Sequence, residues 1–129
     1  PAVHCCGNTD WGLLMDSSVQ AINFDAVDFM DTMAIYPHKL NDFLSKGGVL
    51  AWGAVTNTPL VMQEDADTVI NRIRNGVDLL VSKGVSRELI TQKLIITPAC
   101  GCAGLKVNET ERAYNIMKEL DSKSLSDIF

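Results

Sequence analysis

The stretch Val49-Leu50-Ala51-Trp52-Gly53-Ala54-Val55 carries no polar side chain. A strand with one face in water alternates apolar and polar residues, whereas a strand covered on both faces reads as a continuous apolar run, as in parallel sheets. The segment before it starts with Pro37 and stops at Gly47-Gly48, residues typical of the beginning and the end of a helix. We therefore expect a helix that leads into a fully buried parallel strand.

The same unit recurs towards the C-terminus. Apolar residues spaced three and four apart predict a helix over 69–80, and Gly84 follows it as a C-terminal cap. A buried strand over 94–97 comes next. The last helix is expected to begin at Asn108, with Glu111 as its capping partner.

Towards the N-terminus, two shorter apolar segments predict the remaining strands. One, over 21–24, ends at Asp25, and the other, Ala2-Val3, leads into His4. Four strand–helix units predict an α/β fold with parallel strands and right-handed crossovers. A small doubly wound sheet and half of a (β/α)8 barrel both fit. A full TIM barrel needs about 250 residues, so in the second case the chain would supply about four of its strand–helix units.

Length and composition fit one soluble domain. The chain has no linker-like or low-complexity segment, so residues 1–129 are expected to form a single domain with a sizeable core. The net charge of −5 argues against nucleic acid or an anionic membrane as the main partner, because both require clustered basic residues. No stretch approaches the roughly 18 apolar residues of a membrane span. No signal peptide opens the chain, and a cytoplasmic location is expected.

Four cysteines lie in two clusters near opposite ends of the chain: Cys5 and Cys6, and Cys100 and Cys102. A core of this size does not need disulfides, so we interpret the clusters as reduced thiols that serve a site. His4 and Cys6 are two residues apart, so on an extended segment they face the same way while Cys5 faces away. Because loops that follow parallel strands gather on one side of a sheet, Cys100 is expected to lie beside them.

These residue types are typical of a zinc site. Two thiolates and a neutral imidazole form a three-ligand set that leaves one position for substrate. Zinc keeps a bound thiol deprotonated near neutral pH, where a free thiol with a pKa of about 8.5 is mostly protonated. We therefore predict that His4, Cys6 and Cys100 hold Zn²⁺. Asp25 is expected as a displaceable fourth ligand or as an acceptor from His4, or it simply caps its loop.

The whole chain resembles the carboxy-terminal half of the barrel shared by cobalamin-independent methionine synthase, methylcobamide:coenzyme M methyltransferase and uroporphyrinogen decarboxylase. The His-x-Cys of the zinc methyltransferases is matched by His4-Cys5-Cys6, and their later Cys-Gly by Cys100-Gly101. The acidic ligand of methionine synthase, a glutamate there, falls on or near Asp25. Cys6-Gly7-Asn8 looks like the coenzyme M and decarboxylase branches. The decarboxylases lack the metal-binding cysteine pair, which favours a methyltransferase.

The resemblance implies a zinc-dependent enzyme that moves a methyl group from a methyl-corrinoid or methyltetrahydrofolate donor to a thiol such as homocysteine, as in methionine biosynthesis. Methionine synthase has a histidine after the strand that matches Val49–Val55, thought to act as an acid near the folate. Here Val55-Thr56-Asn57-Thr58-Pro59 carries no titratable side chain, which favours a methyl-corrinoid and a corrinoid protein as partner. Asn8 and Asp10 are candidate substrate-binding residues. A half-barrel also implies a homo-oligomer or association with the missing half.

Three other functions remain open from the sequence. A lyase of the decarboxylase type would not need zinc or Cys100. A non-catalytic zinc-binding module would hold the metal and transfer nothing. A thiol redox protein would use Cys100-Gly101-Cys102 and would not need His4.

Overall fold

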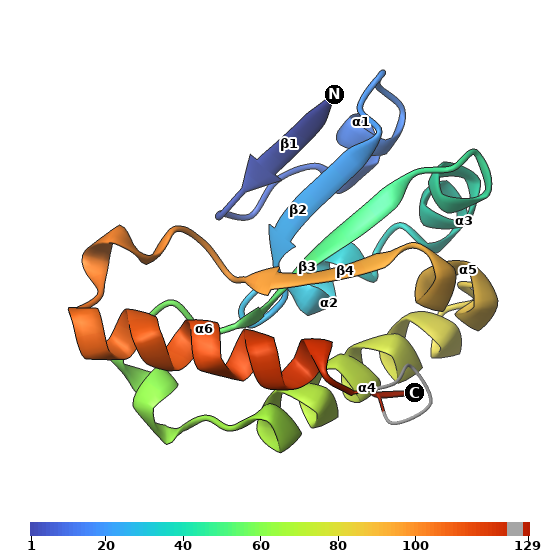
Figure 1. Cartoon of the computed structure of the whole chain (residues 1–129). Coiled ribbons are helices and arrows are strands. Elements are labelled where there is room, and N and C mark those ends of the chain that lie inside the picture. The colour runs from blue at the N-terminus through green and yellow to red at the C-terminus, as the bar shows by residue number, and fades with distance from the viewer. Residues whose placement is uncertain (124–127) are drawn as a thin grey trace.

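The computed structural model describes residues 1–123 and 128–129 of the chain. Its centre is a sheet of four parallel strands, which lie side by side in chain order (Figure 1). The strands are β1 (Ala2–Cys5), β2 (Ala21–Asp25), β3 (Val49–Val55) and β4 (Leu94–Pro98). The parallel α/β sheet expected from the sequence is therefore confirmed, with the central strand at the predicted residues.

Helices alternate with the strands. They are α1 (Trp11–Met15), α2 (Met30–Met33), α3 (Pro37–Ser45), α4 (Ala66–Ser82), α5 (Arg87–Gln92) and α6 (Val107–Asp121). Two short 3₁₀ turns, η1 (Pro59–Gln63) and η2 (Cys102–Gly104), follow β3 and β4. The sequence predicted the longer helices, but not α2 or the two 3₁₀ turns.

The helix ends follow local chemistry, with one correction. Gly47 and Gly84 have φ angles of 93° and 99°, a left-handed conformation that glycine adopts without strain, and they end α3 and α4 as predicted. The expected start of the last helix at Asn108 is wrong by one residue. The helix begins at Val107, and Glu109 rather than Glu111 accepts from the Lys106 backbone N–H, at 2.8 Å.

Among the described residues, helices cover only one face of the sheet, although the apolar central strand predicted burial on both. Alternate residues of the strands pack against α3, α4 and α6 and are fully buried, namely Ile22, Phe24, Leu50 and Trp52. On the other face Asn23 and Ala51 are half-buried and Ile95 is 53% exposed. A doubly wound sheet reverses its strand order and has helices on both faces, so that alternative is wrong. The sequential order and the single covered face are compatible with part of an α/β barrel.

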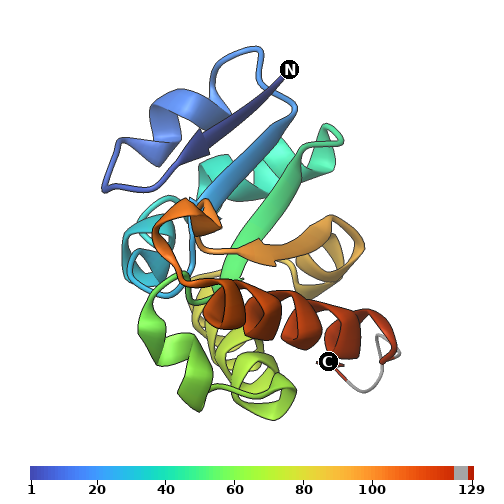
Figure 2. The ribbon, with the colours of Figure 1, turned by 60° about the vertical axis from the view of Figure 1, so that its left-hand side comes forward.

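The strands all run in the same direction, so the segments that follow them gather at one end of the sheet, on the left-hand side of Figure 2. Among these are the loop between β1 and α1, the turn into α2, and η2 with its flanking residues. Residues 4–6 and 100 are therefore close in space although they lie at opposite ends of the chain. Within the described part of the chain, no helix has the length and apolarity needed to cross a bilayer.

Candidate metal centre

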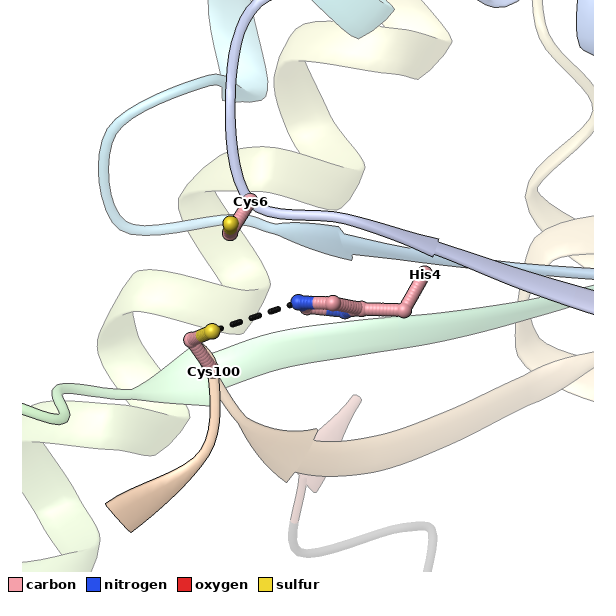
Figure 3. Close-up of side chains that lie close together, drawn as sticks. All are labelled: His4, Cys6 and Cys100. Atoms are coloured by element: carbon pink, nitrogen blue, oxygen red, sulfur yellow. Dashed lines mark hydrogen bonds between the residues drawn. The ribbon is translucent and has the colours of Figure 1, made fainter. Parts of the chain in front are cut away.

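His4, Cys6 and Cys100 converge at this end of the sheet. His4 lies on β1, Cys6 is the first residue after β1, and Cys100 follows β4. Their ligand atoms all lie within 4.8 Å of one another. Figure 3 shows the imidazole of His4 reaching towards the two sulfur atoms. The three-residue group predicted from the sequence is thus assembled.

β1 and β4 are opposite edges of the sheet. The segment that carries Cys100 therefore has to cross over β3 for the thiol to reach His4. The turn after β4 crosses directly above Gly53: a side-chain carbon there would lie 2.6 Å from Cα of Ala99 and 2.7 Å from the carbonyl oxygen of Phe24. The pairing of β3 with β4 shifts register between Gly53 and Val55, and the Ala99 N–H donates to the Val55 carbonyl at 2.8 Å. A bulge of this kind redirects a strand at its end. The missing side chain of Gly53 is what allows the Cys100 segment to lie here.

The ring of His4 is held at both nitrogens. Nε2 lies 3.3 Å from Sγ of Cys100, and Nδ1 lies 2.5 Å from Oδ1 of Asn23. Asn23 stands directly opposite His4 in the pairing of β1 with β2. Accepting from His4 was one of the roles that the sequence left open for Asp25, and in the structure Asn23 takes that place. The available signal was a polar residue inside an otherwise apolar strand.

The two thiols influence each other's protonation. A hydrogen bond with Cys100, and then the charge of its sulfur, raise the pKa of the Cys6 thiol above its usual value. The thiolate of Cys6 is disfavoured because it would lie beside the sulfur of Cys100. A bound dication reverses this preference and favours both thiolates. His4 and Cys6 are exposed, so solvent and small ligands reach the group.

The other two cysteines lie apart from this group. Cys5 packs against the hydrophobic core, as predicted for the residue that faces away from its neighbours, and its thiol donates to the Gly7 carbonyl at 3.4 Å. Cys102 begins η2 and lines a groove together with residues of α6 such as Val107 and Tyr114. All four thiols are free in the structure.

Asp25 is not brought into the ligand group. Its carboxylate is buried, and Oδ1 accepts from the backbone N–H groups of Val27 and Asp28, at 2.8 and 3.1 Å. Of the roles considered for Asp25, the structure therefore shows the loop cap. Asp10 caps α1 by accepting from the Leu13 N–H at 3.1 Å, and Asn8 is exposed in the loop between.

The donor set fits zinc by its chemistry. Two thiolates match the charge of a dication, an imidazole nitrogen is a common third ligand, and three protein ligands leave a coordination position for another group. Comparison of the chain with family models, with curated protein sequences and with solved structures found no match in any of the three.

Proposed function

We propose that the chain is the metal-binding part of a zinc-dependent thiol S-methyltransferase, in which His4, Cys6 and Cys100 hold Zn²⁺. The observation that carries the proposal is the assembly of one imidazole and two thiols within 4.8 Å at the carboxyl end of a parallel sheet. Active sites of parallel α/β proteins lie at this end of the sheet. The resemblance to methionine synthase and its relatives supplies the expected reaction.

The ligand set explains why the acceptor would be a thiol. When bound, zinc lowers the pKa of a coordinated thiol, so that an acceptor such as homocysteine is present as thiolate near neutral pH. Because Cys6 and Cys100 already neutralise the dication, the added sulfur retains the electron density needed to attack a methyl carbon. In the transfer a sulfur–carbon bond forms, the bond between the methyl group and its donor breaks, and the thiol proton passes to solvent.

The segment after β3 bears on the donor. Thr56 is buried and Thr58 caps η1, and their hydroxyl oxygens lie 3.1 Å apart. No acidic or basic side chain occurs between Val55 and Pro59. A folate donor needs a proton delivered to its leaving nitrogen, whereas a methyl-corrinoid does not. We therefore propose a methyl-corrinoid, presented by a corrinoid protein, ahead of methyltetrahydrofolate.

The unpaired edges of the described sheet bear on what would close the fold. Among the described residues, β1 and β4 each pair with one strand only, and the sheet face that carries His4 has no helix on it. A sheet with two free edges and an open face is completed when further strands close it into a barrel. We propose that these four strand–helix units form half of a TIM barrel, closed by a second copy of the chain or by another half-barrel.

The rival functions differ in what they require of the site. A decarboxylase-like lyase gives no reason for Cys100 to lie against His4, at 3.3 Å. A redox pair of Cys100 with Cys102 would bring these two thiols together, whereas Cys102 lines a groove with α6. A zinc-binding module without catalysis has the same ligand geometry and differs only in activity.

Methyl transfer to homocysteine tests the proposal. Zinc-loaded protein is incubated with homocysteine and either methylcobalamin or methyltetrahydrofolate, and methionine is measured. We expect product from methylcobalamin, lost in Cys100→Ala and retained in the matched control Cys102→Ala. Absence of methionine with both donors, from protein that contains zinc, would favour the non-catalytic module instead.

A further inference from the structure

The side chain of Asn23 contacts all three other strands of the sheet. It lies on β2, its Oδ1 faces His4 on β1, and its Nδ2 donates to the Ala51 carbonyl on β3 and to Oγ1 of Thr97 on β4, at 2.8 and 2.9 Å. We propose that Asn23 is a positioning residue that fixes which nitrogen of His4 is presented to the metal. The proposal rests on the metal site inferred above, but its first test needs no metal.

The orientation of the Asn23 amide follows from its partners. The carbonyl oxygen of Ala51 can only accept a hydrogen bond, so the amide atom beside it at 2.8 Å has to be the NH₂ group. The other amide atom, which faces His4, is therefore the oxygen. Thr97 gives the NH₂ group a second acceptor, so both of its hydrogens are used. A flipped amide would lose the bond to Ala51, because a carbonyl oxygen cannot donate to the amide oxygen that would then face it.

The fixed amide decides the tautomer of the imidazole. Oδ1 of Asn23 can only accept, so the proton has to be on Nδ1 of His4, which then donates across 2.5 Å. Nε2 is left with a free lone pair that points to Sγ of Cys100. Sγ of Cys100 lies 3.3 Å from Nε2, and the lone pair that faces it is the one a metal ion would receive. A neutral histidine in water prefers the opposite tautomer, with the proton on Nε2.

The sheet register explains why this residue does the positioning. His4, Asn23 and Ala51 stand opposite one another across β1, β2 and β3, on the open face of the sheet. Ala51 is small, and Gly53, the next residue on the same face, has no side chain. The amide of Asn23 therefore reaches over β3 to Thr97. In this way the strand that carries His4 is tied to the strand that leads to Cys100.

The first experiment reads the tautomer directly. Reduced, metal-free protein labelled with ¹⁵N is examined at pH 8, and the ¹⁵N shifts also report whether each ring is neutral. Long-range ¹H–¹⁵N correlations distinguish the two tautomers, and exposed His38 serves as an internal reference. We expect His4 to carry its proton on Nδ1 and His38 to show the ordinary Nε2–H form. An Nε2–H form of His4 in the wild-type chain overturns the proposal, without any variant and whatever the fate of zinc binding or methyl transfer.

Variants separate positioning from mere packing. Asn23→Ala should move His4 to the Nε2–H form and weaken binding of Co²⁺, followed by its visible absorption, by about tenfold to a hundredfold. Asn23→Asp retains an acceptor for Nδ1–H but places an oxygen against the Ala51 carbonyl. It should therefore be less stable, yet keep the Nδ1–H form and bind Co²⁺ within about threefold of wild type. If Asn23→Ala keeps the Nδ1–H form and wild-type Co²⁺ affinity, Asn23 has only a structural role.

Discussion

Ala99 lies directly over Gly53, so close that a side-chain carbon at position 53 would come within 2.6 Å of its Cα. Both contacts under 2.8 Å involve the backbone, which cannot rotate away as a side chain can. The segment displaced by any such carbon is the one that carries Cys100. The packing of Gly53 is therefore coupled to the geometry of the candidate metal site.

Gly53→Ala should accordingly damage both stability and the site. We expect the free energy of unfolding to fall by about 1–3 kcal/mol, the range for overpacking a buried position, and the affinity for Co²⁺ to fall with it. Urea denaturation and Co²⁺ titration measure the two effects. The matched control is Gly104→Ala, where a side-chain carbon would meet nothing within 4 Å. Equal stability and equal Co²⁺ affinity of the two variants would mean that the position of Cys100 does not depend on the close approach of Ala99 to Gly53.

Asp25→Asn separates the two roles considered for Asp25. An asparagine oxygen can replace the carboxylate as acceptor from Val27 and Asp28, so the turn before α2 should survive. We expect one zinc per chain and nearly wild-type affinity in Asp25→Asn. Asp25→Ala should instead lose stability through the unpaired N–H groups, at about 1 kcal/mol for a lost cap. A large fall in zinc affinity in Asp25→Asn would restore Asp25 as a ligand.

Glu64 ties η1 to the end of β3. The residue is 8% exposed, and its carboxylate forms an ion pair with Arg72 and accepts from the Thr56 N–H at 3.3 Å. Glu64→Ala removes the carboxylate that pairs with the partly buried Arg72 guanidinium, which keeps its bond to the Ala54 carbonyl, and should cost about 3 kcal/mol of unfolding free energy.

The exposed pair Arg87–Asp78 provides the comparison for this ion pair, because its side chains are 48% and 64% exposed. Asp78→Ala should cost less than about 1 kcal/mol, as solvent screens such a pair. Chemical denaturation of both variants measures the difference. If Glu64→Ala and Asp78→Ala lose similar amounts of unfolding free energy, the Glu64–Arg72 ion pair does not stabilise the connection between β3 and η1.

Metal affinity should depend steeply on pH. The hydrogen bond and charge of Cys100 raise the pKa of the Cys6 thiol, so at neutral pH its proton has to leave before zinc binds. Lowering the pH therefore weakens binding, by up to about tenfold per pH unit for each thiol that has to lose a proton. Co²⁺ titrations between pH 6 and 8, together with the protons released, test this. An affinity independent of pH over this range would show that the thiols are not the ligands.

The sequence was a good guide to the long elements because their signals are local. The apolar run of β3 and the glycines that end α3 and α4 are readable without knowing the fold. The short elements α2 and η1 carry no local sequence signal of this kind. Each contributes one fully buried residue, Met33 and Val61, and is held by packing that exists only once the chain has folded.

For the candidate site too, the features set by local sequence signals were predictable and those set by tertiary packing were not. His4, Cys6 and Cys100 were predictable because residue spacing and the shared direction of parallel strands place them together. The hydrogen-bond partner of His4 was not predictable, because Asn23 and Asp25 are two residues apart and face the same side of β2. Only the register, in which Asn23 stands opposite His4, decides between them. That register depends on how the intervening segment packs, which spacing alone does not reveal.

Zinc per chain in reduced protein is the measurement that tests the metal centre most directly. Elemental analysis of the wild type should give one zinc per chain. His4→Ala, Cys6→Ala and Cys100→Ala should each lose it, while the controls His38→Ala and Cys102→Ala should retain it. A folded wild-type protein without zinc after incubation with the metal, or equal zinc in all five variants, would contradict the site proposed here.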